Sequence, residues 1–511
     1  VFTRISKELS MKRRMTKDGT VRPAMQTLPA GVDRRDFIKA SALVAGMGVW
    51  VATSRHALGE DSKSPNEMMG GASIGVGGKG DGDSDQLAKH TNLVAICDTD
   101  EKTVGKKGER HPKAKKFTDF RKMLDEMGKE IDAVTISTPD HTHAVATMMA
   151  IKMGKNVYTQ KPLAHDVWEA RQLRLAANEH KIASQMGNQG TAGSKFREGV
   201  EVIRAGMIGP VKEVHVWTNR PIWPQAPKVM SRLPEMPVPE NLHWDLWLGT
   251  APERPYNHGY QPFNWRGWWD FGTGALGDMG CHTANLPFMA LKLAHPTSIE
   301  GECGDLNPET YPSWAKVKFE FAARGDMPAA TFHWYEGGIE KEDSNGKKMR
   351  ELVHPPKELT EKVMDEYNKV LEAKGDKRVK SGKKVTLSNS GSIIVGEKGM
   401  LYSPDDYGGS WELVPAEAYH DFKAPEPTLP RNKDGGDEGQ KIEWLAAAKG
   451  GPPALSNFNY AGLLAEFILL GNIAIKNPGK KLDFDAENLT FTNEKSADKF
   501  LKRQYRSPWS L

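Results

Sequence analysis

Gly75-Val76-Gly77-Gly78-Lys79-Gly80 is the stretch of sequence that decides the fold. It matches the fingerprint GxGxxG, in which the glycines permit a tight turn, a close approach of the backbone to a pyrophosphate and close packing of the following helix. We therefore expect Gly75, Gly77, Gly78 and Gly80 to hold a dinucleotide. Because GxGxxG also occurs in ordinary turns, this expectation depends on the residues around it.

Asp98 supplies the next part of the pattern. It ends the apolar run that follows the glycines, 23 residues after Gly75, where a carboxylate accepts hydrogen bonds from the adenosine ribose hydroxyls. The same carboxylate would repel a 2′-phosphate, so the predicted cofactor is NAD, and NADP is less favoured. One feature departs from the pattern: the strand before the glycines, 68–74, is glycine-rich where valine and isoleucine are usual.

Hydrophobic patterning divides the chain into two domains. Short apolar runs alternate with helical patterns from about residue 70 to 190, as in βαβ units with a parallel sheet. Strands are predicted at 93–97, 133–137, 156–159 and 182–185, and helices at 120–127, 143–153 and 167–180. Longer alternating segments follow at 211–219, 315–321, 329–334 and 392–395, with a hairpin turn at 396–399. The sequence thus predicts an α/β fold, with an N-terminal Rossmann dinucleotide-binding domain at 70–190 and a larger open sheet at 191–511.

The lysine-rich stretch 340–384 interrupts the second domain. Its charge favours a solvated insertion with one helix, and we assign it no chemistry.

Residues 1–57 are predicted to be a leader. Arg34-Arg35-Asp36-Phe37-Ile38-Lys39 precedes a thirteen-residue apolar run at 40–52, which is typical of a twin-arginine signal read by the export machinery. The run is too short to cross a bilayer, which takes ~20 residues. We expect export to the periplasm, with membrane anchoring if the leader stays uncleaved. Because such cargo leaves folded and then meets no soluble nicotinamide pool, the NAD is expected to be tightly bound.

Charge and cysteine usage exclude several classes of partner. The net charge is +4, but residues 1–57 contribute +7, which leaves about −3 for the rest of the chain. A nucleic-acid partner is therefore not expected. Three cysteines without CxxC spacing indicate neither a disulfide framework nor a zinc site, so no metal is expected. After the leader, no apolar run is expected to span a membrane.

Three further motifs follow the glycine loop in order. They are Ser137-Thr138-Pro139-Asp140-His141-Thr142-His143, Gln160-Lys161-Pro162 and Gly277-Asp278-Met279-Gly280-Cys281-His282. With the glycine loop they resemble the Gfo/Idh/MocA family of sugar and polyol oxidoreductases. The likeness runs from about residue 72 to the carboxyl end, including 458–475 and the terminal Tyr505-Arg506-Ser507-Pro508-Trp509. It implies a Rossmann domain followed by an α+β domain whose open, mostly antiparallel sheet carries the substrate site and often the oligomer contact. A homo-oligomer formed through the sheet domain is accordingly expected.

The resemblance also assigns roles to single residues. It places the cofactor against the end of the fourth strand and the segments beyond it, at Ser137, Thr138, Pro139, His143, Gln160, Lys161 and Asn188. Lys161 corresponds to the lysine beside the reacting carbinol, ahead of a cis proline, here Pro162. Gln160 stands where the family has glutamate. Because a neutral amide cannot support an ammonium as a carboxylate would, Lys161 is expected to titrate lower.

Asp278 and His282 complete the candidate catalytic group, which consists of Lys161, Asp278 and His282. Their i, i+4 spacing places both on one face of a helix, where the carboxylate could fix the imidazole tautomer. An imidazole so held can accept a hydroxyl proton while hydride leaves the same carbon. The open alternative is structural, with Asp278 as a helix cap and His282 satisfied in the core.

Tryptophan and arginine concentrate between residues 217 and 269. Tryptophan faces stack on sugar rings and arginine reads hydroxyls, so a carbohydrate pocket is predicted, although a single tryptophan is more often part of the core. The residues expected to contact substrate are Gln189, Trp223, Arg266 and Trp268.

These predictions combine into one hypothesis and two alternatives. The hypothesis is an exported oxidoreductase that contains NAD and acts on a secondary hydroxyl of a sugar or sugar derivative, with His282 as proton acceptor, Asp278 as its orienter and Lys161 as polarising donor. The first alternative is an NAD-dependent, redox-neutral glycosidase on the same fold. The second is a non-catalytic sugar-binding protein.

Overall fold

The computed structural model of the chain describes residues 68–342 and 346–511. The predicted leader at 1–57, with its twin-arginine motif and apolar run, lies outside the described residues. All elements named below belong to one compact unit, Ser62–Leu511.

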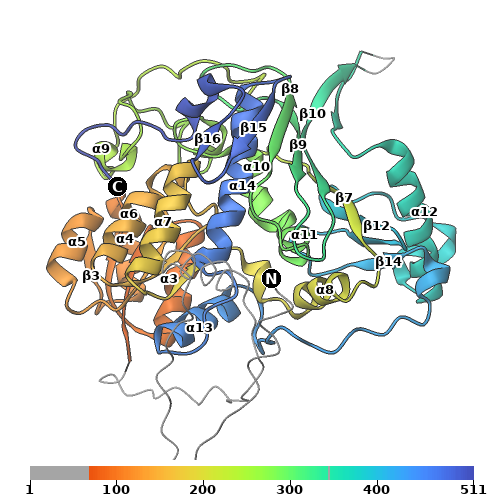
Figure 1. The fold of residues 1–511 in the computed structure, drawn as a ribbon. Coiled ribbons are helices and arrows are strands. Elements are labelled where there is room, and N and C mark those ends of the chain that lie inside the picture. Colours follow the sequence, from red (N-terminus) through yellow and green to blue (C-terminus); the bar gives the residue numbers. More distant parts are fainter. Residues whose placement is uncertain (1–67, 343–345) are drawn as a thin grey trace, which may run out of the picture. The chain divides into compact units, whose positions relative to one another are not determined.

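The first sheet has six parallel strands in the order β3-β2-β1-β4-β5-β6, the doubly wound order of a Rossmann domain. The strands are β1 (Gly70–Ile74), β2 (Asn92–Cys97), β3 (Lys115–Phe117), β4 (Ala133–Ile136), β5 (Asn156–Thr159) and β6 (Ser184–Met186). Helices α3 (Lys79–His90), α4 (Glu101–Arg110), α5 (Phe120–Met127), α6 (Asp140–Lys152) and α7 (Val167–Glu179) connect them (Figure 1). The predicted parallel Rossmann sheet is confirmed.

Strand β1 shows why the first strand is rich in glycine. All five of its residues are buried between β2 and β4. A Cβ on Gly70 would lie 1.7 Å from the carbonyl oxygen of Glu130, and one on Gly71 would lie 2.3 Å from Thr91 Oγ1. Valine or isoleucine has no room at these two positions, so the departure seen in the sequence is a consequence of close packing.

The second sheet has ten strands in the order β14-β13-β12-β7-β10-β9-β8-β15-β16, with β11 paired to β10. The strands are β7 (Val211–Thr218), β8 (Ser298–Cys303), β9 (Trp314–Phe321), β10 (Ala330–Glu342), β11 (Lys348–Leu352), β12 (Gly391–Gly396), β13 (Met400–Ser403), β14 (Glu412–Val414), β15 (Lys481–Asp485) and β16 (Thr490–Phe491). Among the described strands of this second sheet, β7 and β10 run parallel and the other pairs are antiparallel. The expected large, mostly antiparallel sheet is confirmed.

The remaining helices lie around and between the two sheets. They are α8 (Ser194–Arg204), α9 (Trp244–Leu248), α10 (Gly274–Thr283), α11 (Asn285–Ala290), α12 (Lys357–Ala373), α13 (Gly436–Ala448) and α14 (Phe458–Lys476). Short 3-10 turns are η1 (Gln189–Ala192), η2 (Asn264–Gly267), η3 (Lys377–Gly382), η4 (Ala416–Tyr419) and η5 (Lys495–Phe500).

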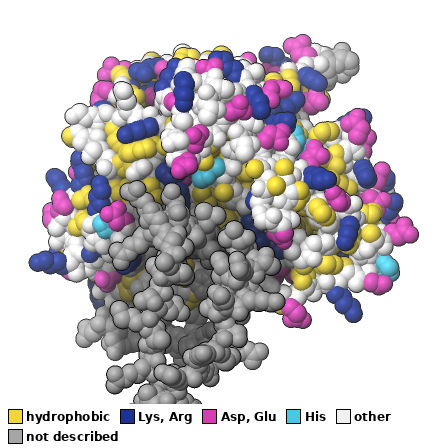
Figure 2. Space-filling view, viewed as in Figure 1, with side chains coloured by type: hydrophobic (Ala, Val, Ile, Leu, Met, Phe, Trp, Pro, Cys, Tyr) yellow, Lys and Arg dark blue, Asp and Glu magenta, His cyan; other side chains and the backbone are white. Residues whose placement is uncertain are grey.

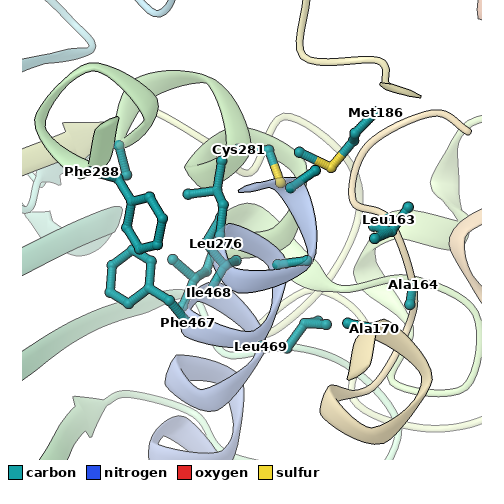
Figure 3. Close-up of a cluster of buried hydrophobic side chains, with 14 of the residues drawn as sticks. Leu163, Ala164, Ala170, Met186, Leu276, Cys281, Phe288, Phe467, Ile468 and Leu469 are labelled. Atoms are coloured by element: carbon teal, nitrogen blue, oxygen red, sulfur yellow. The ribbon is translucent and has the colours of Figure 1, made fainter. Parts of the chain in front are cut away.

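Helix α14 joins the two halves of the fold (Figure 1). Phe467 and Ile468 pack toward the side chains of α10 and α11, while Leu469 faces those of α7, as Figure 3 shows. The helix is long and apolar enough to cross a membrane, which differs from the expectation of no such run, but 83% of its apolar window is buried inside the fold. Its composition is explained by burial against both sheets.

The described residues of the stretch 340–384 form regular elements. The stretch forms the end of β10, β11, α12 and η3, and α12 buries Val363, Tyr367 and Leu371 in a cluster with Trp217 and Tyr402. Its lysines face solvent while one face of the helix covers the outer side of the large sheet. The lysines of the sequence indicate the solvent-exposed face of this helix. The apolar face is harder to recognise, because residues of the two faces alternate along a helix.

On the face seen in Figure 2, side chains of both charges are interspersed over the described surface.

Candidate active site

The glycine loop has the geometry of a dinucleotide cradle. Gly75 has a φ of +76°, and a Cβ there would lie 2.6 Å from the carbonyl oxygen of Ser137. A Cβ on Gly80 would lie 2.0 Å from the carbonyl oxygen of Gly75, so the start of α3 can approach β1 this closely because position 80 is glycine. Gly77 and Gly78 are placed at the turn, directly before the first residue of α3. The free N–H groups of a helix N-terminus favour an anion such as a pyrophosphate.

Asp98 follows β2 and lies beside this turn. Its carboxylate accepts hydrogen bonds from the amides of Val76 at 2.9 Å and Asp100 at 3.1 Å, and burial raises its pKa above the ordinary value. The carboxylate is thus fixed against the glycine loop, as the sequence predicts for a group that contacts a ribose.

The segment after β4 forms the next wall. Ser137, Thr138 and Pro139 are half-buried there. His143 lies beneath them in α6, with Nδ1 2.7 Å from the carbonyl oxygen of Pro162 and Nε2 2.8 Å from that of Thr138. Because both ring nitrogens face backbone carbonyls, the structure places His143 as a support for this wall and leaves it no nitrogen for a cofactor.

Lys161, Asp278 and Arg266 meet at one carboxylate oxygen. Lys161 Nζ donates to Asp278 Oδ1 at 2.8 Å and to the Asp278 carbonyl oxygen at 2.7 Å, and Arg266 Nε donates to Oδ1 at 3.0 Å. The two cations hold the pKa of Asp278 well below its ordinary value against the opposing effect of burial. The peptide bond from Lys161 to Pro162 is cis. The carboxylate that accompanies Lys161 in this protein therefore comes from α10.

His282 lies one turn after Asp278 in α10 and is 5% exposed. Burial, with the nearby Lys161 cation, lowers its pKa well below the ordinary value, so the ring is neutral near pH 7. Its Nδ1 is buried and makes no hydrogen bond within the described part of the chain, and the Tyr407 ring packs edge-on at 4.9 Å. A neutral imidazole is the protonation state that can accept a proton.

The expected contact between Asp278 and His282 differs in the structure. No hydrogen bond joins their side chains among the described residues, and Asp278 Oδ1 instead binds the two cations. The physical reason is competition, because an ammonium and a guanidinium attract a carboxylate more strongly than a neutral imidazole does. Asp278 therefore positions Lys161 and Arg266 and does not orient His282.

Asp83 is a buried carboxylate that sequence reasoning missed. Its Oδ2 accepts from Gln160 Nε2 and Ser137 Oγ, each at 2.8 Å, and its Oδ1 binds Lys441 Nζ at 2.7 Å and Lys79 Nζ at 3.0 Å. Both the Asp83 and Lys441 side chains are fully buried. Gln160, which replaces the usual glutamate, is thus hydrogen-bonded to a carboxylate that α3 supplies. The available signal was the i, i+4 spacing of Lys79 and Asp83 after the glycine loop.

Asp140 is a second missed residue, inside the Ser137–His143 motif. It is buried, and Thr273 Oγ1 donates to its carboxylate at 2.6 Å. Burial raises its pKa to about 7, and the Arg266 and Lys161 charges oppose this rise. A carboxyl group that titrates near neutrality therefore lies close to the cation pair.

Asn188 and Gln189 lie between the Rossmann sheet and α13. Asn188 is fully buried, and its Oδ1 accepts from Ser456 Oγ at 2.6 Å. It is therefore a structural link, which differs from the expected direct contact with the cofactor. Gln189 begins η1, and its buried Oε1 has no partner in the described residues.

The predicted substrate tryptophans are more buried than expected. Trp268 is 1% exposed and packs edge-on against Tyr260 at 4.7 Å, so it has no face for a sugar, and that prediction is corrected. Trp223 is 5% exposed, with Nε1 donating to Gln225 at 2.7 Å. Trp268 belongs to a buried aromatic cluster with Trp247, Tyr260 and Phe271, whereas Trp223 lies outside that cluster and packs edge-on against Phe263 at 6.0 Å. Arg266 alone of the substrate set joins Lys161 and Asp278 directly, within the described residues.

Two family models match the chain. Residues 71–188 match the NAD-binding Rossmann fold of the Gfo/Idh/MocA oxidoreductase family, and residues 193–328 match the C-terminal alpha/beta domain of the same family.

Curated relatives match shorter segments. The chain is 32% identical over 80 residues to the 1,5-anhydro-D-fructose reductase of Ensifer adhaerens, covering 16% of this chain and 24% of that protein. It is 27% identical over 207 residues to an alpha-N-acetylgalactosaminidase of Shewanella oneidensis, covering 35% and 44%. The matched segments thus span less than half the length of these relatives.

A solved structure shows the same fold. The WlbA dehydrogenase of Bordetella pertussis, in complex with NADH and UDP-GlcNAcA, is 14% identical and superimposes with a TM-score of 0.53 over 82% of this chain and 99% of that chain.

Proposed function

The chain belongs to the Gfo/Idh/MocA family of NAD-binding oxidoreductases, and from this premise we propose that it oxidises a secondary hydroxyl of a sugar or sugar derivative. The observation that carries the proposal is the grouping of Lys161, Asp278 and neutral His282 on the carboxyl side of the first sheet. That side is where ligands bind in doubly wound folds.

NAD suits the residues present better than NADP does. The steric need for glycine at positions 75 and 80 makes room for a backbone approach to a pyrophosphate, and the fixed Asp98 carboxylate disfavours a 2′-phosphate. Gly75, Gly77, Gly78, Asp98 and the wall at 137–139 would hold it. When bound, NAD supplies the acceptor for a hydride.

The chain's own groups move and stabilise the proton. Lys161, held by Asp278, donates to the substrate oxygen and stabilises the negative charge that develops there. His282 accepts the hydroxyl proton, since burial keeps its ring neutral near pH 7. Arg266, whose guanidinium lies 4.2 Å from the centre of the Trp265 ring, is placed to bind a further substrate oxygen.

We extend the proposal to location and cofactor retention. The twin-arginine motif at 34–39 supports export to the periplasm in the folded state. An enzyme without access to a nicotinamide pool must keep its NAD and regenerate it on site, with a second carbonyl compound as the electron acceptor.

A redox-neutral glycosidase is the second candidate, favoured by the likeness to the alpha-N-acetylgalactosaminidase over 207 residues. In that reaction, oxidation of a hydroxyl acidifies the neighbouring C–H. A base then removes that proton, the aglycone leaves, and addition of water and reduction complete the hydrolysis.

One pair of assays separates the two candidates. The protein is incubated in D2O with free sugars and, separately, with aryl glycosides, without added NAD. The oxidoreductase proposal predicts a 340 nm band with a free sugar, which decays when a carbonyl acceptor is added, while the glycosides stay intact. Glycoside cleavage with deuterium next to the oxidised carbon would establish the glycosidase instead. Silence in both assays would support a sugar-binding protein.

A further inference from the structure

Three potential metal ligands gather on the outer face of the large sheet. Strands β7 and β10 pair in parallel with His215 opposite His333, and their imidazole rings stack at 4.8 Å with an interplanar angle of 8°. Glu213 is two residues before His215 and so lies on the same face. Its Oε1 is 3.0 Å from His215 Nε2 and 3.6 Å from His333 Nε2.

The state of His215 points independently to a ligand. The residue is 2% exposed, and its Nδ1 lies 3.0 Å from the Tyr335 hydroxyl. Its buried Nε2, directed toward Glu213, makes no hydrogen bond in the part of the chain that the structure describes. With Nδ1–H donating to Tyr335, Nε2 carries a lone pair. Histidines that bind metals commonly donate their second ring nitrogen in this way, which fixes the tautomer and the ring orientation.

We infer that Glu213, His215 and His333 form a zinc site that links β7 to β10. Zinc binds imidazole nitrogen at about 2.0–2.1 Å in tetrahedral geometry, which sets its ligand atoms about 3.3 Å apart. The separations of 3.0 and 3.6 Å lie on either side of this value, and all three ligand atoms are within 4.8 Å of one another. A rotation of the His333 ring, whose side chain is 24% exposed, would bring them onto one ion. Two imidazoles and one carboxylate suit zinc better than magnesium or calcium, which prefer oxygen ligands.

The charges that face the cluster are compatible with a cation. Lys318 of β9 is the register partner of His333 and forms an ion pair with Glu320 at 2.6 Å. The positive charge of Lys318 is therefore balanced by Glu320. On the β12 side, the register partner of His215 is the apolar Ile393. The Glu213 carboxylate therefore sets the local charge.

The cluster is separate from the proposed active site. The core that contains α14 includes the strand neighbours of the two histidines, which are Val214, Val216 and Phe332. Because successive residues of a strand point to opposite faces, the histidines point away from this core. The ion would stabilise the parallel contact between β7 and β10. Three protein ligands leave a fourth position for water or for a donor from another molecule.

The test uses the full chain without a polyhistidine tag, stripped with EDTA and titrated with ZnCl2 by calorimetry. The account predicts one zinc ion per chain, with affinity at least about tenfold weaker in His333→Ala and in Glu213→Gln, since even the loss of a partner behind a ligand costs about 10–100-fold. His420→Ala is the matched control, because His420 is an exposed histidine paired with Asp421 on the surface, and it should bind zinc as the wild type does.

Thermal unfolding gives a second readout that does not depend on enzyme activity. Zinc should raise the Tm of the wild type and of His420→Ala, and at the same zinc concentration it should raise that of His333→Ala by clearly less, because a ligand that binds the native state stabilises it by mass action. Circular dichroism verifies that each variant is folded. If His333→Ala does not fold, Glu213→Gln, at a half-exposed carboxylate, replaces it in the comparison. Absence of zinc binding, or equal binding by the wild type and the folded variants, would overturn the inference.

Discussion

At the residue scale, one carboxylate balances the two cations of the candidate site. Asp278 pairs with both Lys161 and Arg266, while His282, one helical turn away, remains neutral and without an Nδ1 partner among the described residues. In the proposed function, this division gives the two basic groups different tasks: the lysine stabilises negative charge, and the imidazole accepts a proton.

Replacement of His282 by alanine tests that division. We expect the rate of sugar oxidation to fall by about a hundredfold or more, the usual size of a general-base contribution, while bound NAD is retained. Turnover is measured with a saturating sugar and acceptor, and nucleotide content by absorbance after denaturation. Near-normal turnover would make His282 a structural residue and transfer the proton to another group.

The Asp83 carboxylate is the residue-scale feature with the largest expected effect on stability. Asp83→Asn leaves the Lys441 ammonium buried without its partner, and breaking a buried pair in this way costs about 3–5 kcal/mol. Glu438→Gln, in α13 like Lys441, removes a surface partner of Lys89. This change should cost about 1 kcal/mol or less. Chemical denaturation at pH 7 measures both. Equal effects in the two variants would contradict the central place of Asp83.

Asp140 should make stability depend on pH. Its pKa in the folded state is about 7, above the ordinary value, so the folded chain keeps a proton that the unfolded chain has lost. The free energy of unfolding should therefore decrease as pH rises from about 4 to about 7. Asp140→Asn should flatten that part of the profile, whereas Asp421→Asn on the surface should not. Parallel profiles for all three proteins would show that Asp140 does not titrate in this window.

At the element scale, the fold was predicted more completely than the site. Helices α5 and α7 and strands β4 and β5 lie where hydrophobic periodicity places them, because local burial and local pattern agree there. The pattern could not show which tryptophans face outward. Trp268 and Trp223 are buried by loops whose packing depends on distant segments. It also could not show that Asp83 meets Lys441 or that His215 meets His333, since these contacts form by pairing of elements far apart in the chain.

Close contact between β8 and α14 provides an element-scale prediction. A Cβ on Gly301 would lie 2.7 Å from the backbone of Ala474 in α14, and backbone atoms cannot rotate away as a side chain can. Gly301→Ala should therefore lower the free energy of unfolding by about 1–3 kcal/mol, as overpacking does. Gly105→Ala, where a Cβ in helix α4 meets nothing within 4 Å, should stabilise by up to about 1 kcal/mol. Denaturant titration of both variants compares them, and a neutral Gly301→Ala would mean that the contact is looser than described.

At the scale of the whole molecule, the carboxyl-terminal region completes the Rossmann half. Helix α13 brings Lys441 to Asp83, and Arg503 and Tyr505 both bind the Glu169 carboxylate, at 2.8 and 2.6 Å. The Arg121 guanidinium lies over the ring of Trp509 at 4.4 Å. Segments that are last in the sequence thus support the first sheet.

This arrangement also bears on cofactor retention. Behind the glycine loop, Asp83 of α3 is paired with Lys441 of α13, so the cradle is joined to a helix that is more than 300 residues away in the sequence. A cofactor held by such a composite structure is consistent with the proposal that NAD remains bound after export.

The measurement that tests the central claim most directly is the ultraviolet spectrum of the purified protein during addition of sugars, with no nucleotide supplied. The account predicts that NAD co-purifies in near-stoichiometric amount, that at least one sugar produces a 340 nm band of up to one equivalent per chain, and that Asp98→Ala loses the nucleotide while remaining folded. Protein that is empty after purification and binds NADP in preference to NAD would contradict both the resident cofactor and the role of Asp98.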